Sequence, residues 1–212
     1  MRRPEFIARQ SGRPSGLLGR LIGYIMSYET ASANEAAITQ LDPRATDRVL
    51  EIGFGHGRTI ERLAAAVPGG FVAGLDVSDD MLQMATRRCR SLIAAGRVRL
   101  TLGDSAAISY PTGSFDKVLA VHTIYFWSQP LADLQEVRRV LRPGATFVIG
   151  FRPKGDPGTA EFPASVYTFY TPDEVISLLR HAGFGEVTAT AGSDGIVFAR
   201  GVASDDLLSS IQ

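Results

Sequence analysis

The stretch VLEIGFGHG, at residues 49–57, runs from an apolar β-type segment into a loop in which every second residue is glycine. Gly53, Gly55 and Gly57 fall between that segment and the helical pattern that follows it. Glycine lets the backbone turn sharply and approach a ligand closely at such a junction. The spacing is GxGxG, and the third glycine of the NAD fingerprint, GxGxxG, would fall on Arg58. The stretch therefore predicts a ligand-binding loop, with a purely structural glycine loop as the alternative.

Short β-rich runs alternate with helical patterns on both sides of this loop. The runs lie at 48–52, 71–76, 98–102, 115–121 and 146–151. The helical patterns lie at 57–66, 79–94 and 130–141. Strands joined by crossover helices form a mostly parallel sheet that is covered on both faces. We therefore expect an α/β fold.

The last part of the chain breaks this alternation. A capping box at 171–174, with proline at the first helical position, begins a helix that runs to Gly183. Two further runs follow at 184–190 and 195–201. The connection between them is too short for a crossover, so they form an antiparallel hairpin. The expected sheet has seven strands, parallel except for the last strand.

Two helical patterns precede the first strand. Residues 1–15 are polar, the pattern at 16–28 carries an apolar stripe at helical spacing, and a shorter helix fits 31–41. The stripe consists of Leu17, Leu18, Leu21, Ile22, Ile25 and Tyr28. Because such a stripe needs an apolar surface to bury it, we expect it to pack on the core as a mobile N-terminal helical lid. The alternative is a helix that lies on a membrane surface, which the nearby arginines favour.

The length of the chain limits the number of domains, and its charge limits the kinds of binding partner. A chain of 212 residues favours one core, for which we expect a tail and lid at 1–34, the main domain at 35–202 and a tail at 203–212. The 22 Lys+Arg residues balance 22 Asp+Glu residues, which removes the electrostatic footprint of a nucleic-acid-binding protein. We expect no nucleic-acid partner, and the sequence leaves the oligomeric state open.

Cysteine and histidine usage bears on metal binding. The single cysteine, Cys89, excludes an internal disulfide framework and a cluster of thiolate ligands. His56, His122 and His181 are too scattered to form a paired-ligand motif. We therefore expect no metal.

The apolar run at 17–26 bears on localisation. It is too short to span a bilayer and it carries Arg20. Arg2 and Arg3 precede it, as in a signal peptide, but Arg20 interrupts the apolar region that a signal peptide requires. We expect a cytoplasmic chain with no stable membrane insertion.

Two acids end neighbouring strands of the expected sheet. Asp76 closes the run at 71–76, where a carboxylate can accept hydrogen bonds from both hydroxyls of a ribose. Asp104 follows the run at 98–102, where it can accept from an adenine amine. Either acid alone is also typical of a solvated helix cap. Together with the glycine loop they line the crevice in which open α/β sheets bind ligands, and they predict an adenosine-containing cofactor.

At this point the sequence resembles the class I S-adenosylmethionine-dependent methyltransferases, in particular the type 11, ubiquinone-biosynthesis-like branch. The segments that carry the resemblance are VLEIGFGHG (49–57), VAGLDVSDDM (72–81), LTLGDSAAI (100–108), FDKVLAVHTIYFW (115–127) and EVRRVLRPGATFVI (136–149). The resemblance implies a Rossmann-like fold and S-adenosyl-L-methionine as the cofactor, with S-adenosyl-L-homocysteine as the product.

The resemblance also implies roles for matching positions. Glu51 and the glycine-loop backbone would hold the methionine part of the cofactor, and Asp76 would bind its ribose. Val77 and Met81 would lie against the adenine ring. Asp104 would accept a hydrogen bond from the amine of that ring. The implied cofactor-binding set is Glu51, Gly53, Gly55, Gly57, Asp76, Val77, Met81, Asp104, Ser105 and His122.

His122, just past the fourth strand, is the candidate catalytic residue. Neutral imidazole titrates near pH 6.5, so it suits a general base if the acceptor is a hydroxyl. The alternative is that His122 only packs against the cofactor or forms a hydrogen bond with it. No acidic partner that would set its tautomer can be assigned from its sequence neighbours.

The expected activity is methyl transfer from S-adenosylmethionine to a small-molecule acceptor by in-line displacement. Aromatic residues suit a small, partly apolar acceptor. The candidate acceptor-pocket residues are Tyr24, Tyr28, Tyr125, Trp127 and Tyr170. The alternatives are an NAD-dependent oxidoreductase on a related sheet and a non-catalytic S-adenosylmethionine-binding protein.

Overall fold

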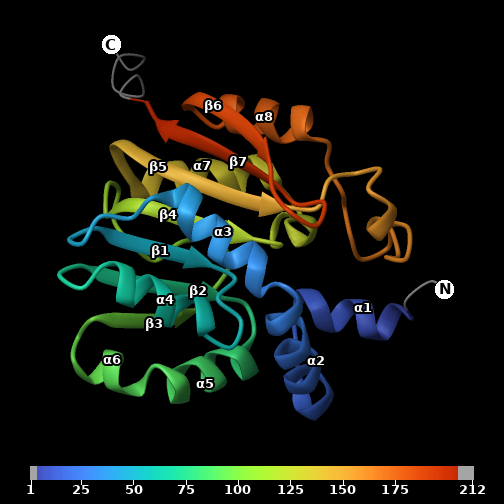
Figure 1. Ribbon diagram of the computed structural model, residues 1–212, viewed down its shortest axis with the longest axis horizontal. Coiled ribbons are helices and arrows are strands. Elements are labelled where there is room, and N and C mark those ends of the chain that lie inside the picture. The colour runs from blue at the N-terminus through green and yellow to red at the C-terminus, as the bar shows by residue number, and fades with distance from the viewer. Residues whose placement is uncertain (1–3, 205–212) are drawn as a thin grey trace.

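The computed structural model describes residues 4–204, apart from the side chains of Met26, Ser27 and Glu29. Its strands are β1 (Arg48–Ile52), β2 (Phe71–Asp76), β3 (Val98–Leu102), β4 (Phe115–Val121), β5 (Leu141–Phe151), β6 (Phe184–Ala191) and β7 (Val197–Ala203). They form one sheet in the order β3-β2-β1-β4-β5-β7-β6 (Figure 1). In this sheet only β7 runs against its neighbours, pairing antiparallel with β5 and β6. The predicted fold class is confirmed.

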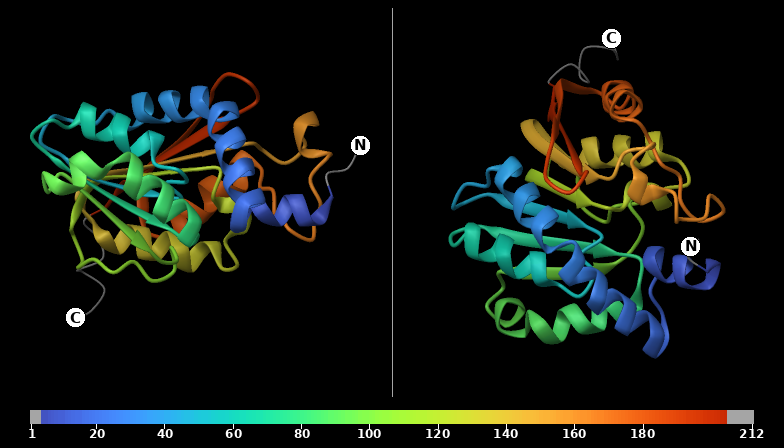
Figure 2. Two further views of the ribbon diagram at one scale, coloured as in Figure 1. Left: turned by 90° about the horizontal axis from the view of Figure 1, so that it is seen from below. Right: turned by 45° about the vertical axis from the view of Figure 1, so that its right-hand side comes forward.

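Helices cover both faces of the sheet. They are α3 (Ala31–Leu41), α4 (Arg58–Ala66), α5 (Asp79–Arg88), α6 (Arg90–Ala94), α7 (Pro130–Val140) and α8 (Pro172–His181), with short 3₁₀ turns η1 (Ile124–Phe126) and η2 (Pro157–Thr159). Figure 2 shows α3 and α4 on one face and α7 and α8 on the other. Adjacent residues of β1 serve both faces: Val49 joins the cluster under α3 and α4, and Leu50 joins the cluster under α7 and α8. The central strands are therefore apolar on both sides, which explains their continuous apolar runs.

Two predicted helices differ most from the observed ones. The helix predicted at 79–94 is broken at Cys89 into α5 and α6. The helix predicted at 130–141 ends at Val140, and β5 begins directly at Leu141, which pairs with Phe115 of β4. Pro143 disfavours helical geometry at the residue before it, so the chain leaves the helix early and extends. Pro143 is visible in the sequence, but the pairing of Leu141 with Phe115 depends on the tertiary structure.

The N-terminal residues form a lid of two helices beyond the carboxyl ends of the parallel strands (Figure 1). They are α1 (Glu5–Gly12) and α2 (Gly16–Glu29). The polar residues expected to form a tail contain a helix, because α1 forms there and buries Ala8 completely. Residues 1–3 and 205–212, which belong to the tails expected at each end, lie outside the described residues.

The expectation that the α2 stripe packs on the core is wrong. Leu17 is 86% exposed, and Leu21 and Ile25 are about half exposed. Polar groups hold α2 instead: Asp80 of α5 accepts from the Gly16 backbone at 2.6 Å and from the Arg20 side chain at 2.7 Å. These contacts turn the Arg20 side of the helix toward the domain and leave the leucine side outward. Within residues 4–204, no helix is long and apolar enough to cross a membrane.

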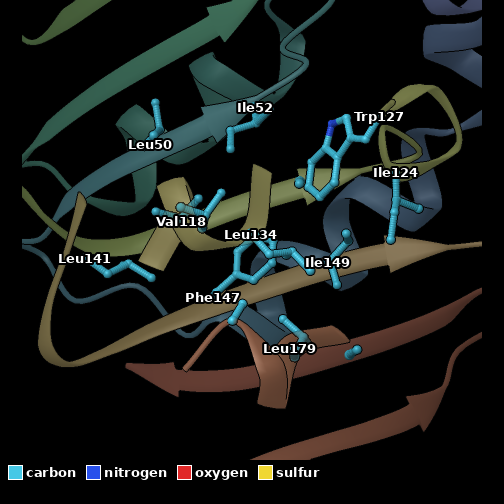
Figure 3. Close-up of a cluster of buried hydrophobic side chains, with 14 of the residues drawn as sticks. Leu50, Ile52, Val118, Ile124, Trp127, Leu134, Leu141, Phe147, Ile149 and Leu179 are labelled. Atoms are coloured by element: carbon cyan, nitrogen blue, oxygen red, sulfur yellow. The ribbon is translucent and has the colours of Figure 1, made fainter. Parts of the chain in front are cut away.

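The two leucines of α7 test the account of the core. Leu134 is fully buried beside Phe147 and Ile149 (Figure 3). Leu131 is 37% exposed. We expect Leu134→Ala to lower the free energy of unfolding by about 2–5 kcal/mol, because it removes packed methyl groups and leaves a cavity. Leu131→Ala, the same change on the same helix, should cost under about 1 kcal/mol. Denaturant unfolding measures both, and equal losses would contradict the observed burial.

Candidate functional site

A cavity of about 620 Å³ opens at the carboxyl ends of the parallel strands, under the lid. Its walls come from the glycine loop after β1, the ends of β2 and β3, the loop after β4, and residues 9–15 of the lid. This is the crevice in which open α/β sheets bind ligands. Its volume lies in the range of small-molecule and cofactor sites.

Nine of the ten predicted cofactor-binding residues line this cavity. They are Glu51, Gly53, Gly55, Asp76, Val77, Met81, Asp104, Ser105 and His122. Gly57 is outside the lining. A Cβ on Gly57 would lie 2.8 Å from the Cβ of Ala85, so this glycine allows α4 to begin close against α5.

Backbone conformation explains the other two loop glycines. Gly53 and Gly55 have φ angles of +78° and +54°, which only glycine adopts without strain. No protein atom lies within 4 Å of a Cβ built on Gly55, so the backbone there faces open space. A Cβ on Gly53 would clash with the Thr123 side chain, and the loop can therefore lie close to the chain after β4.

Asp76 joins the two loops that form the cavity floor. Its Oδ2 accepts from the Gly55 backbone at 2.8 Å, and its Oδ1 accepts from the Ser78 backbone at 2.9 Å. Burial raises the pKa of this carboxyl to about 6, while the hydrogen bonds from Ser78 and Gly55 oppose that rise. Each carboxylate oxygen retains a second lone pair, with which it can accept from a ligand hydroxyl.

Glu51 is a buried acid with unused hydrogen-bonding capacity. Its side chain is 4% exposed, and its Oε2 makes no hydrogen bond within residues 4–204. Burial, and then the charge of Asp76, raises its pKa well above the ordinary range. A hydrogen bond with the Thr59 side chain opposes that rise, but it leaves Oε2 open. A buried carboxylate with no opposite charge beside it is costly and is stabilised by a cation. This corner of the cavity therefore fits the ammonium group of an amino acid.

The two polar residues that follow β3, Asp104 and Ser105, differ in what they offer a ligand. Asp104 is exposed at the rim, where its Oδ1 accepts from the Ala106 backbone at 3.0 Å. Ser105 is buried, and its hydroxyl donates to Asp133 of α7 at 2.5 Å. Asp104 keeps an oxygen for a ligand, whereas the Ser105 hydroxyl is occupied and offers a ligand its backbone.

His122 is held in an unusual backbone conformation at the end of β4. Its φ angle is +58°, and its N–H donates to the Gly150 carbonyl of β5 at 2.8 Å. Non-glycine residues in this region are uncommon and cluster at functional sites. The Nδ1 atom lies 3.0 Å from the Tyr125 hydroxyl, and burial lowers the pKa of the imidazole to about 4.

One of the five predicted acceptor-pocket residues, Trp127, lines the cavity. Tyr24 and Tyr28 lie on the exposed side of α2, and Tyr125 and Tyr170 lie outside the lining. Sequence reasoning missed Phe54, Val166 and lid residues 9–15. Residues 9–15 are polar, so their sequence gives little indication that they line a cavity. Gly12 is the one clue, because a Cβ there would lie 2.7 Å from Phe126.

Burial of Asp76 predicts a pH dependence of stability. Its folded pKa of about 6 exceeds the ordinary 3.8, so the folded protein holds this proton more tightly than the unfolded chain. The stabilisation is complete below about pH 4 and is lost as the pH rises through 6. We expect wild type to lose roughly 2–3 kcal/mol relative to Asp76→Asn across that window. Unfolding curves of both proteins from pH 4 to 7.5 measure this, and a constant difference would contradict it.

Comparisons with known proteins agree with this geometry. A family model for methyltransferase domains matches residues 49–144. An uncharacterized methyltransferase, YdaC of Bacillus subtilis, is 31% identical over 134 residues, which are 63% of this chain and 72% of that protein. The demethylmenaquinone methyltransferase of Tropheryma whipplei is 36% identical over 129 residues, and the chain spans half of its length.

The fold also occurs in solved structures. A SAM-dependent methyltransferase from Aquifex aeolicus superposes with a TM-score of 0.72 at 22% identity, over 84% of this chain and 93% of that one. Its likeness extends the match beyond the segment that the family model covers. The sheet order, the glycine loop and the relationship to YdaC lead to one conclusion: the chain belongs to the class I S-adenosylmethionine-dependent methyltransferases.

Proposed function

We propose that this methyltransferase transfers the S-methyl group of S-adenosylmethionine to a small, partly apolar acceptor by in-line displacement. The observation that carries the proposal is one cavity lined by the open Oε2 of Glu51, the open backbone at Gly55 and the Asp76 carboxylate. Glu51 matches the ammonium group of the cofactor, and Asp76 matches its ribose. The open backbone at Gly55 matches the part of the cofactor that joins these two groups.

The cofactor would lie along the carboxyl ends of β1, β2 and β3. Glu51 would hold the methionine ammonium and Asp76 the ribose hydroxyls. Met81, which is buried in the cavity wall, would contact the adenine ring, and Asp104 at the rim would accept from its amine. This order follows the strand order β1, β2, β3 in the sheet.

The bound cofactor supplies a methyl group that its sulfonium has already activated. The protein then has to align the acceptor and exclude water, and alignment alone can contribute about 7–11 kcal/mol in favourable cases. The lid suits the second task, because residues 9–15 cover the cavity and Ser78 donates to the Pro14 carbonyl at 2.6 Å. Gly23 brings α2 close to Met81, where a Cβ would lie 3.0 Å from the sulfur.

The acceptor would occupy the part of the cavity beyond His122. Phe126, Trp127 and Val166 line that part, and they favour an apolar or aromatic acceptor over a strongly charged one. One relative in the comparison is named for a demethylmenaquinone acceptor, which is consistent with an apolar ring compound. Because the chain spans only half of that relative, the likeness does not assign this acceptor.

Two alternatives make different predictions. An NAD-dependent oxidoreductase would need a glycine at Arg58 to complete its fingerprint. A non-catalytic binding protein would keep the cofactor site and transfer nothing. Calorimetric titration with S-adenosylmethionine and with NAD separates the first alternative, and we expect binding of the former only.

A transfer assay separates the second alternative. The full chain, with cofactor labelled on the S-methyl group, would be incubated with a panel of phenols, quinols, thiols and amines. We expect labelled product from an aromatic or quinol member, because that class fits the apolar wall. Tight cofactor binding with no labelled product across the panel would support the non-catalytic protein.

Removing the Asp76 carboxylate should weaken cofactor binding. Asp76→Ala loses two charge-assisted hydrogen bonds to the ribose, each worth about 1.5–3 kcal/mol, so Kd should rise by roughly 100-fold or more. Asp79→Ala is the matched control, because Asp79 is an exposed acid of α5 that contacts Gln83. Calorimetry with S-adenosylhomocysteine measures both, and an unchanged Kd in a folded Asp76→Ala protein would refute the assignment.

A further inference from the structure

The Tyr125 hydroxyl lies between a backbone amide and the His122 ring. Its oxygen accepts from the Arg152 N–H at 2.5 Å, and it is 3.0 Å from His122 Nδ1. The tyrosine belongs to η1 and the arginine follows the last residue of β5, so three segments meet at this hydroxyl. Burial raises the pKa of the phenol far above neutrality, and it remains protonated.

The position of one proton follows from this geometry. An amide N–H can only donate, so the phenolic oxygen is the acceptor of the Arg152 contact. Within residues 4–204, the remaining hydrogen-bond contact of the phenol is His122 Nδ1, so the buried phenolic proton is hydrogen-bonded only if Nδ1 accepts it. A neutral imidazole that accepts at Nδ1 carries its own proton on Nε2.

An aromatic cluster fixes the Tyr125 ring. Phe169, Tyr167 and Phe126 have ring centroids 5.0, 5.9 and 6.0 Å from it. The Thr168 backbone also donates to the Tyr125 carbonyl at 3.0 Å. The segment after β5 therefore forms a wall behind His122, and the hydroxyl cannot turn away without disturbing that packing.

The surroundings of His122 favour its neutral form. Tyr125 faces it from η1 and Arg152 from the end of β5, while Asp156 pairs with Arg152 at 2.8 Å. Burial, and then the Arg152 charge, lowers the pKa of the imidazole to about 4. Glu51 and Asp76 line other parts of the same cavity. The Nδ1 edge faces Tyr125, which lies outside the lining, so the Nε2 edge is the one available to the cavity.

We propose that Tyr125 is a positioning residue that fixes neutral His122 with its Nε2 proton toward the cavity, so that His122 donates a hydrogen bond to an acceptor oxygen and removes no proton. This rests on the proposed methyl transfer. An acceptor lone pair forms the new bond to the methyl carbon while the sulfonium bond breaks and its electron pair returns to sulfur. Any acidic proton of the acceptor must leave to solvent beforehand, as it does from an acidic phenol or enol.

The imidazole tautomer provides a direct test that needs no acceptor. Long-range ¹H–¹⁵N correlation spectra of the labelled full chain distinguish Nδ1–H from Nε2–H, and His122→Gln identifies the His122 signals. We expect the Nε2–H form with no titration between about pH 5.5 and 8. Tyr125→Phe removes the donor to Nδ1, so the pKa of His122 should rise by about one unit or more. A proton on Nδ1, or titration near 6.5 in wild type, would overturn the proposal.

A matched control and a kinetic readout complete the test. Tyr28→Phe removes a hydroxyl from the exposed side of α2, where it contacts Tyr24, and should leave the His122 signals unchanged. With an acceptor from the transfer panel, the wild-type rate should show no limb near pH 6–7. Such a limb, absent in His122→Gln, would assign a general base and contradict the proposal. A panel without any product would count against methyl transfer and would leave the spectroscopic result standing.

Discussion

The carboxylate of Asp76 is the constraint on which the site depends. Two loops leave the sheet side by side, one after β1 and one after β2, and one carboxylate accepts from the backbone of both. Buried charge of this kind is retained only where hydrogen bonds compensate it. The same oxygens face the cavity, so the group that shapes the floor also offers the acceptors that a ribose requires.

From this carboxylate a chain of contacts reaches the lid. Ser78, which donates to Asp76 through its backbone, also donates through its hydroxyl to Pro14 in the lid. Two residues farther on, Asp80 holds the start of α2 through Gly16 and Arg20. The first turn of α5 therefore connects the cavity floor to the lid above it. This arrangement accounts for a lid that is attached by polar groups while its leucines remain exposed.

Local pattern predicted the sheet and much of the cavity floor. The strand at 48–52 and the glycines after it carry short-range signals, because a positive φ angle and a buried run are properties of a few neighbouring residues. Acids at strand ends could be assigned to the cavity for the same reason, since parallel strands deliver their carboxyl ends to one edge.

Features set by tertiary contacts could not be predicted in this way. The sequence shows that Tyr125 is aromatic, but not that its ring packs on Phe169 behind His122 instead of lining the cavity. The hydrogen-bond partner of His122 is Tyr125, three residues away. It is a neutral phenol, so an acidic neighbour is the wrong signal for it. Likewise, the stripe of α2 predicted burial, but the charged contacts of Arg20 decided which side faces the domain.

The central claim is that the cofactor binds along one edge of the cavity, with its methionine end at Glu51 and its adenine end at Asp104. A crystal structure of the protein with S-adenosylhomocysteine tests it most directly. The account predicts both ribose hydroxyls within hydrogen-bond distance of Asp76 and the ammonium group beside the Glu51 carboxylate. A nucleoside bound away from Asp76, or bound with the opposite polarity so that its adenine lies at Glu51, would contradict it.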